Sequence, residues 1–418
     1  MGVIGLGYVG LPLAVSYAKA GFQVIGFELD ENKVAALMRG ESYIIDVAQE
    51  DLQEVLAAGR FRATTDMGLM QEVDSVNICV PTPLGKTRDP DISYIQAAVN
   101  AIAPRLHRGM MVILESTTYP GTTEEVILPL LSAEGMEVGK DFFLAFSPER
   151  VDPGNPQFNT INIPKVVGGV TPECTKVASA LYGQVMETIV PVSSVRVAET
   201  VKLLENTFRS VNIALVNEIA LMCNALDIDV WEVIEGAATK PFGFMPFYPG
   251  PGLGGHCIPI DPFYLSWKAK LAGSEARFID LAGQVNGYMP KHVLQLVTQG
   301  LNDQSKSVRG SKVLVVGVAY KGGIDDVRES PALDIMNMLA DLGAEVSWYD
   351  PHVPGLETSR PARKLEKWDQ DSIGAFDAAV IVTPHAEVDH SLLLEVGPVI
   401  IDTRNALKGI NSDKLIKL

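Results

Sequence analysis

Cysteine is scarce in this sequence, and its basic residues are outnumbered by its acidic ones. The four cysteines include no C-x-x-C pair, which argues against both a disulfide framework and a zinc site and favours a reducing cytoplasm. Lys and Arg number 34 against 51 Asp and Glu, a formal net charge of −17. Such an acidic chain is not expected to bind nucleic acid or an anionic membrane surface, so local features of the fold must hold any anionic ligand.

Long uncharged runs are also rare. The first 18 residues are uncharged, but they lack the basic leader of a signal peptide and fit a strand, a glycine turn and the start of a buried helix. No other segment approaches 18 unbroken apolar residues, so we expect no membrane span. The first strand has almost no residues before Val3, which raises the expectation that a few N-terminal residues are missing.

The length of 418 residues and the hydrophobic fraction of 47% predict a globular chain of two or three domains. Strand-like and helical segments alternate at first, which indicates a parallel sheet. A helical pattern without Gly or Pro runs from Val197 to Asp227, and the last third repeats the order of the first. We predict an α/β fold with two Rossmann-like doubly wound parallel-sheet domains joined by a long central helix. The expected domains are residues 1–195, 196–300 and 301–418.

Gly5, Gly7 and Gly10 form a G-x-G-x-x-G pattern between the first strand and the first helix. Glycines there let backbone N–H groups approach a pyrophosphate at the positive end of the helix. Glu28 ends the next strand, where an acid accepts hydrogen bonds from ribose hydroxyls. The alternative is an ordinary glycine-rich turn. Because Glu28 and the acidic residues after it repel a 2′-phosphate, we predict NAD rather than NADP as the cofactor.

A loop crowded with Gly and Pro, residues 239–262, contains the cysteine best suited to chemistry. Cys257 lies in GLGGHCIPIDP, where Gly254 and Gly255 leave space for a ligand beside an exposed thiol. A buried, inert cysteine is the alternative here, and it is the expected state of Cys79 and Cys223.

Three polar residues interrupt the apolar surface of the long predicted helix. Lys202 and Asn206 lie four residues apart and project from one face, with Arg209 one turn further. A solvated polar stripe is the alternative. Glu149, in FSPER at the end of a predicted strand, is ambiguous by itself because exposed carboxylates are common.

Seven segments taken together resemble the UDP-glucose/GDP-mannose dehydrogenases. They are GLGYVG, VPTP, ESTTYPGTT, FSPER, AETVKLLENTFR, GLGGHCIPIDP and DDVRESPA, and the resemblance continues to DTRN at 402–405. It implies an NAD-dependent enzyme that oxidises the C6 alcohol of a nucleotide sugar to a carboxylate in two hydride transfers. A cysteine captures the aldehyde as a thiohemiacetal, and the thioester formed from it is then hydrolysed.

The same resemblance assigns roles by position. Cys257 resembles the nucleophile, Lys202 the cation that stabilises oxyanions, and Glu149 the general base of the hydrolysis. The implied catalytic residues are Cys257, Lys202, Glu149, Asn206, Asp261 and Thr117. The implied cofactor-binding residues are Gly5, Gly7, Tyr8, Val9, Gly10, Glu28, Lys33, Thr82 and Arg328. The implied substrate-binding residues are Arg150, Lys202, Asn206, Arg209, Lys240, Gly254 and Lys321, and no metal ligand is implied.

Three departures from the UDP-glucose branch of this family bear on the substrate. Ile260 replaces the usual lysine of the cysteine loop, YIIDVAQEDL replaces a tyrosine/proline loop near 43–52, and residues 240–252 form a longer, more aromatic segment. These features resemble the branch that acts on UDP-N-acetylhexosamines, above all UDP-N-acetylglucosamine. UDP-N-acetylmannosamine and UDP-glucose remain the alternatives. Residues 355–368 match no family motif and are expected to form a variable surface segment.

Two further classes of function stay open. A non-catalytic nucleotide-sugar sensor would keep the fold without the chemistry, but it is disfavoured because Cys257 and Lys202 are both present. A single-oxidation hydroxyacid dehydrogenase would need no cysteine and would release one NADH per substrate instead of two. We also expect a homodimer or higher homo-oligomer, because one chain covers only part of the apolar surface of the long helix.

Overall fold

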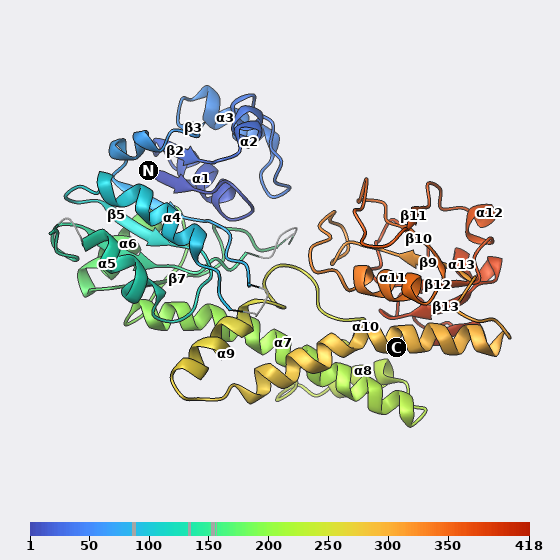
Figure 1. Ribbon diagram of the computed structural model, residues 1–418. Coiled ribbons are helices and arrows are strands. Elements are labelled where there is room, and N and C mark those ends of the chain that lie inside the picture. The colour runs from blue at the N-terminus through green and yellow to red at the C-terminus, as the bar shows by residue number, and fades with distance from the viewer. Residues whose placement is uncertain (86–88, 133–134, 152–154, 156) are drawn as a thin grey trace. The chain divides into compact units, whose positions relative to one another are not determined.

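The computed structural model describes residues 1–85, 89–132, 135–151, 155 and 157–418 (Figure 1). The chain forms two compact units. The first unit contains Met1–Glu205 and Phe263–Glu275, and the second contains Asn206–Pro262 and Ala276–Leu418. The predicted division into three domains, 1–195, 196–300 and 301–418, stays a prediction.

The first unit is built on a sheet whose described strands follow the order β3-β2-β1-β4-β5-β6-β7-β8. The strands are β1 (Gly2–Ile4), β2 (Val24–Phe27), β3 (Phe61–Thr64), β4 (Ser75–Ile78), β5 (Met111–Leu114), β6 (Phe143–Phe146), β7 (Lys165–Gly169) and β8 (Ile189–Pro191). Neighbouring strands are parallel except for the antiparallel pair β6 and β7. The crossover from β1 through β2 and back to β4 is the arrangement of a doubly wound fold.

Helices cover both faces of this sheet. They are α1 (Gly10–Lys19), α2 (Glu31–Met38), α3 (Gln49–Ala57), α4 (Ser93–Ile102), α5 (Leu128–Leu131) and α6 (Pro172–Tyr182), with the shorter turns η1 (Met67–Glu72), η2 (Ala103–Arg105) and η3 (Thr123–Ile127). Val3 of β1 packs in a core cluster with residues of α1, α3 and α6. Ile4, the next residue, packs with residues of α4 on the opposite face. Strands buried on both faces explain the continuous apolar runs in the sequence.

The long central helix is α7 (Val195–Ala225), which begins two residues before the predicted Val197 and ends two before Asp227. The division between the two units falls within it, after Glu205. It is followed by α8 (Val230–Ala238), whose first turn is capped by the Asp229 side chain, then by α9 (Asp261–Leu271) and α10 (Arg277–Asp303). The expected loop at 239–262 has no regular element before α9.

The second unit repeats the strand order of the first as β11-β10-β9-β12-β13-β14, all parallel. The strands are β9 (Lys312–Val316), β10 (Glu345–Tyr349), β11 (Arg363–Lys364), β12 (Ala378–Ile381), β13 (Val399–Asp402) and β14 (Leu415–Lys417), and the helices are α11 (Pro331–Asp341), α12 (Gln370–Ile373) and α13 (Leu392–Val396). The predicted fold class is confirmed. The segment expected to be variable surface, 355–368, contributes the short edge strand β11.

Among the described residues, no helix is both long enough and apolar enough to cross a membrane.

Candidate active site

The glycine loop after β1 has the geometry that a dinucleotide needs. Gly5 has a φ of +87° and donates its N–H to the carbonyl of Phe27 at 2.8 Å. A Cβ on Gly10 would lie 1.8 Å from the carbonyl oxygen of Gly5, so only glycine lets the helix start this close to the strand. A Cβ on Gly7 would meet no protein atom within 4 Å, which leaves open space over the loop. These residues therefore fit the predicted pyrophosphate site.

Glu28 directly follows β2 and faces this loop. Its Oε2 accepts the Leu6 N–H at 3.1 Å, and its Oε1 accepts the Leu29 N–H at 2.9 Å. The carboxylate is half-buried, and its oxygens keep acceptor capacity for a ribose. This arrangement fits the predicted contact with NAD.

The other predicted cofactor residues of the first unit lie around the same end of the sheet. Tyr8 is exposed in the glycine loop, and Val9 is the N-cap residue of α1. The Lys33 ammonium lies 5.6 Å from the centre of the Tyr43 ring. Thr82 is buried, and its carbonyl accepts the Tyr264 hydroxyl at 2.9 Å, which attaches α9 to the VPTP segment.

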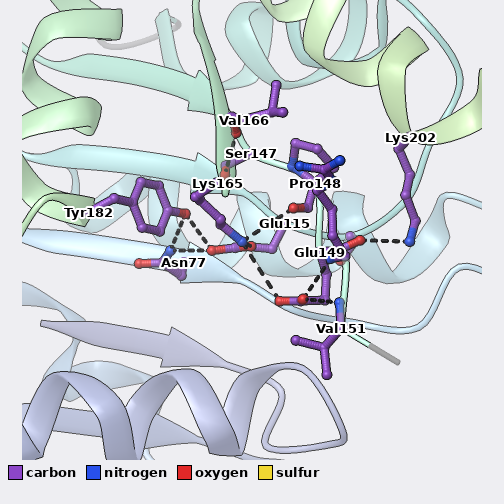
Figure 2. A network of polar contacts seen from close by, with 12 residues as sticks. Asn77, Glu115, Ser147, Pro148, Glu149, Val151, Lys165, Val166, Tyr182 and Lys202 are labelled. Atoms are coloured by element: carbon purple, nitrogen blue, oxygen red, sulfur yellow. Dashed lines mark hydrogen bonds and ion pairs between the residues drawn. The ribbon is translucent and has the colours of Figure 1, made fainter. Parts of the chain in front are cut away.

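Glu149 lies in the turn after β6, where the backbone N–H groups of the next two residues and two lysines contact it (Figure 2). Its Oε1 accepts the N–H groups of Arg150 and Val151, each at 2.6 Å. Its Oε2 lies 3.7 Å from the ammonium of Lys165. Lys202, buried on α7, donates to the backbone carbonyl of Glu149 at 2.6 Å. The structure therefore brings together two residues that the sequence placed 53 positions apart.

A buried polar network lies behind this turn. The Lys165 ammonium is 2.6 Å from Oε2 of Glu115, and Glu115 Oε1 accepts both the Asn77 amide at 2.9 Å and the Tyr182 hydroxyl. Burial alone lowers the pKa of Lys165, but Glu115 and Glu149 outweigh it and raise that pKa, so Lys165 is a cation at neutral pH. Lys165 and Glu115 were not predicted from the sequence. Their only signal was a charged residue at the edge of each apolar strand segment, KVVGG and MMVILES.

Thr117, half-buried, belongs to the loop between β5 and η3, and Glu199 of α7 fastens the far end of that loop. The Glu199 carboxylate accepts the N–H of Gly121 at 2.6 Å and both the N–H and the hydroxyl of Thr123, at 3.0 and 2.7 Å. Burial raises the pKa of Glu199 to about 7, although these hydrogen bonds oppose the shift. Glu199 is a third residue, after Lys165 and Glu115, that was not predicted from the sequence.

The cysteine loop lies in the second unit. Cys257 is exposed, and its carbonyl accepts the N–H of Asp261 at 2.8 Å at the start of α9. A Cβ on Gly254 would lie 2.6 Å from Cβ of Tyr320, and Gly255 has a φ of +83°. Glycine at these two positions therefore lets the loop run close against Tyr320 and keeps Cys257 at the surface.

Asn206 and Asp261 contact each other beside this loop. The Asn206 side-chain amide donates to the Asp261 carboxylate at 2.6 Å, and both residues are buried. This pairing fixes the start of α9, one turn after Cys257, against α7. The chain thus supplies Cys257, Asn206 and Asp261 as one group in the second unit.

The remaining predicted residues differ in their surroundings. The Arg150 guanidinium forms an ion pair with the Glu205 carboxylate, and the Arg328 guanidinium forms one with the Asp326 carboxylate, each with an N···O distance of 2.6 Å. Arg209 is exposed on α7, and the Lys240 ammonium lies 5.2 Å from the Phe242 ring in the exposed part of the long loop. Lys321 follows Tyr320 and is half-buried. Their predicted ligand contacts stay predictions.

Arg404, at the end of β13, is a cation that the sequence analysis did not assign. Its Nε donates to the Val382 carbonyl at 3.2 Å, and a Cβ on Gly250 would lie 2.3 Å from its Nη1. Burial lowers the pKa of Arg404 to about 10, so the guanidinium is still charged at neutral pH. No carboxylate of the described residues forms an ion pair with it. A half-buried, unpaired guanidinium attracts an anion.

One group of side chains in the second unit has metal-ligand chemistry. His352, His385 and Glu387 present ligand atoms within 4.8 Å of one another. However, Nδ1 of His385 accepts the Gly323 N–H at 3.2 Å, and its Nε2 lies 3.0 Å from the Asp350 carboxylate. Because both ring nitrogens of His385 have protein partners, this group lacks the third open ligand that a metal would need.

Three family models match successive parts of the chain. All three describe the UDP-glucose/GDP-mannose dehydrogenase family: the NAD binding domain matches residues 1–186, the central domain 196–288, and the UDP binding domain 314–409.

Individual relatives match over nearly the whole length. The UDP-N-acetyl-D-mannosamine dehydrogenase of Pyrococcus horikoshii is 36% identical, covering 97% of this chain and 95% of the relative. The UDP-N-acetyl-D-glucosamine 6-dehydrogenase of Pseudomonas aeruginosa is 35% identical, covering 92% and 90%. Among solved structures, the P. horikoshii UDP-D-ManNAc dehydrogenase superposes with a TM-score of 0.91 at 34% identity, covering 100% of this chain and 98% of that one. A UDP-glucose dehydrogenase of Pyrobaculum islandicum gives 0.83 at 28%, covering 96% and 93%.

Proposed function

Because the chain belongs to the UDP-glucose/GDP-mannose dehydrogenase family, we propose that it oxidises C6 of a UDP-N-acetylhexosamine to the uronic acid through a thioester on Cys257. The predicted family, the enzyme class of NAD-dependent UDP-sugar dehydrogenases and NAD as the cofactor are confirmed. The proposal adds the substrate, the residues and the order of the chemistry. The observation that carries it is the exposed Cys257 in its glycine-lined loop, within a chain that also holds the paired Lys202 and Glu149.

Two NAD molecules, bound in turn at the glycine loop, would each supply the acceptor for one hydride. The protein supplies the rest. Gly5 and Gly10 let the strand turn sharply into α1, and Gly7 leaves room for the pyrophosphate at the start of that helix. Glu28 accepts hydrogen bonds from the ribose. In the second unit, the unpaired guanidinium of Arg404 is suited to the diphosphate of the UDP-sugar, with Lys321 as a second cation.

Cys257 carries the second half of the reaction. Its thiol adds to the C6 aldehyde, so that an S–C bond forms and the carbonyl oxygen takes a proton to give a thiohemiacetal. Loss of the second hydride and of that proton gives a thioester. Glu149 takes a proton from water as the water attacks the thioester, which releases the carboxylate and the Cys257 thiol. Lys202 stabilises the oxyanion that develops on C6, because a fixed charge in a dry site interacts strongly with it.

The substrate preference rests on the loop and on the relatives. The exposed aromatic segment around Phe242, Phe244 and Tyr248 offers apolar surface for a 2-acetamido group. UDP-N-acetylglucosamine is the first candidate. UDP-N-acetylmannosamine is the second, because relatives of that name are 36% and 37% identical to this chain. Initial rates with NAD and a panel that also contains UDP-glucose, UDP-N-acetylgalactosamine and GDP-mannose test this choice, and a tenfold preference for UDP-glucose would contradict it.

Rapid-quench kinetics with intact-protein mass spectrometry test the chemistry. We expect two NADH per sugar from the wild type and a thioester mass on Cys257 in Glu149→Gln. Cys257→Ser should nearly abolish acid formation while part of the first hydride transfer survives. Cys223→Ser, which changes a buried cysteine of α7, is the matched control and should retain two-NADH turnover. Full two-NADH turnover by Cys257→Ala would refute the thioester mechanism, and one NADH per sugar from the wild type would favour a single-oxidation enzyme.

A further inference from the structure

We infer that Lys165, fixed by the buried carboxylate of Glu115, is a positioning residue that holds the Glu149 carboxylate in place for thioester hydrolysis. The inference rests on the proposed role of Glu149 as the general base. It assigns a function to two charged residues that lie in the sheet behind the catalytic turn and that the proposed chemistry does not otherwise use.

Lys165 occupies the centre of the network (Figure 2). It is the first residue of β7, and only 5% of its side chain is exposed. Its ammonium lies 2.6 Å from Glu115 Oε2 and 3.7 Å from Glu149 Oε2, and it donates to the Pro148 carbonyl at 3.3 Å. Lys165 therefore contacts both the carboxylate of Glu149 and the backbone of the preceding residue.

Glu115 keeps Lys165 in this position. It directly follows β5, its side chain is fully buried, and Asn77 and Tyr182 both donate to its Oε1. Because Asn77 belongs to β4, Tyr182 to α6 and Glu115 directly follows β5, regular elements hold the anchor in place. Residues on rigid elements hold a neighbouring group more accurately than residues on loops do.

Lys202 has a different task in the same turn. It donates to the backbone carbonyl of Glu149, whereas Lys165 faces the carboxylate itself. The backbone N–H groups of Arg150 and Val151 occupy Oε1 of Glu149, which leaves Oε2 as the oxygen that Lys165 orients. Removal of Lys165 frees this oxygen to rotate, while the contact with Lys202 remains.

A purely structural role explains the buried pair poorly. A buried ion pair generally adds little to stability, because the cost of removing both charges from water offsets their attraction, and apolar replacements are often as stable. Removing one partner alone is strongly destabilising because it leaves a buried charge. The test therefore uses Lys165→Met combined with Glu115→Gln, which removes both charges, together with Lys165→Arg.

We expect the double variant to lose about 10- to 100-fold in kcat, as displaced catalytic groups do, while KM for the sugar changes less than about threefold. After one turnover it should accumulate the thioester on Cys257, and Lys165→Arg should recover part of the rate. The matched control is Lys19→Met with Asp51→Asn, which removes an exposed ion pair of the same unit and should leave kcat unchanged.

The outcomes separate this inference from the proposed function. If Glu149→Gln accumulates the thioester and the folded double variant does not, the positioning role of Lys165 is wrong while the role of Glu149 stands. If neither variant accumulates the thioester, Glu149 is not the general base, and the proposed function is wrong on this point, as is the inference that rests on it. A double variant that does not fold would show that the pair is needed for the fold, and Lys165→Arg then decides: its kcat must fall without a change in melting temperature, and an unchanged kcat overturns the inference.

Discussion

The two sheet units share the turn that follows their first strand. In the first unit Gly5 has a φ of +87° and donates to the Phe27 carbonyl at 2.8 Å. In the second unit Gly317 has a φ of +80° and donates to the Tyr349 carbonyl, also at 2.8 Å. Both sheets also have the same strand order around this turn, β3-β2-β1-β4 in the first unit and β11-β10-β9-β12 in the second. The glycine at this position therefore serves the shared fold and does not by itself indicate a ligand.

The acid that ends the second strand differs between the units. Glu28 is half-buried and accepts one N–H from the glycine loop. Asp350 is fully buried and accepts from five groups, the N–H groups of Val318, Ala319, His352 and Val353 and the His385 ring. The second unit therefore satisfies its acid with its own backbone and a histidine, whereas the acid of the first unit keeps acceptor capacity.

The middle position of the glycine pattern shows the same contrast. Gly7 in the first unit corresponds to Ala319 in the second, where the sequence reads G-V-A-Y-K-G. The Ala319 N–H donates to Asp350 at 3.0 Å, so the second loop is closed over its own carboxylate. One loop architecture is thus open for a dinucleotide in the first unit and filled by protein groups in the second.

The largest expected effect comes from removing the acid of the second unit. Asp350→Ala should lower the free energy of unfolding by about 3–5 kcal/mol, because it leaves buried N–H groups and a histidine without their acceptor. Burial opposes ionisation of Asp350, but the hydrogen bonds from His385, Ala319 and His352 lower its pKa to about 2. Its stabilising effect is therefore present above pH 4 and is lost as the pH falls towards 2. Hydrogen exchange of the β9 and β10 amides measures the loss.

Glu28→Ala is the matched change in the first unit. It should weaken NAD binding by about 1–3 kcal/mol, since charge-assisted hydrogen bonds to the ribose are lost, and it should hardly change the melting temperature. The variant should also discriminate less against NADP. If Glu28→Ala destabilises the fold as much as Asp350→Ala does, the two acids play the same role and the contrast between the units is wrong.

The buried carboxylates of the two units should also give opposite pH dependences. The pKa of Glu199 is raised from 4.5 to about 7, so the folded chain binds more protons than the unfolded chain between these values. Stability should therefore fall as the pH rises from about 4.5 to 7, by about 3 kcal/mol from this group. Melting curves across this range should lose that slope in Glu199→Gln.

Glu124→Gln provides the control for that experiment. Glu124 lies on the same segment as the groups that Glu199 binds, but it is paired at the surface with Arg196. The charge of Glu124 makes only a small contribution to the raised pKa of Glu199, so its removal should leave most of the slope between pH 4.5 and 7 in place. An unchanged slope in Glu199→Gln would show that Glu199 is ionised in the folded chain throughout this range.

Much of the fold could be predicted because its strands are buried on both faces. Short apolar segments such as KVVGG and MMVILES are typical of such strands, and the repeated order of segments indicates two similar sheets. The direction of a strand cannot be predicted in this way, because an apolar run pairs equally well with a parallel or an antiparallel neighbour. The antiparallel pairing of β6 with β7 was therefore not predicted.

The candidate site could be predicted only where a local pattern marks it. Glycines flanking Cys257 and the four-residue spacing of Lys202 and Asn206 are visible in the sequence. Lys165 begins β7 and Glu115, 50 residues earlier, directly follows β5, and only the folded sheet brings their charges to 2.6 Å. Arg404 likewise appears as one more charged residue after a strand until the structure shows that it forms no ion pair with a carboxylate of the described residues.

The smallest effect concerns the middle glycine, and it tests most directly what opens the first loop. Gly7→Ala gives the first unit the residue that the second has at this position. Its Cβ would meet no protein atom within 4 Å, so the melting temperature should stay the same. NAD affinity, measured by titration calorimetry, should nevertheless fall about tenfold, because the methyl group occupies the space through which the pyrophosphate approaches the backbone.

Gly10→Ala is the contrasting control. Its Cβ would lie 1.8 Å from the Gly5 carbonyl oxygen, so both stability and binding should be lost. Unchanged affinity in a stable Gly7→Ala protein would show that the pyrophosphate does not approach the loop at Gly7, and the difference between Gly7 and Ala319 would then have no bearing on which unit binds the dinucleotide.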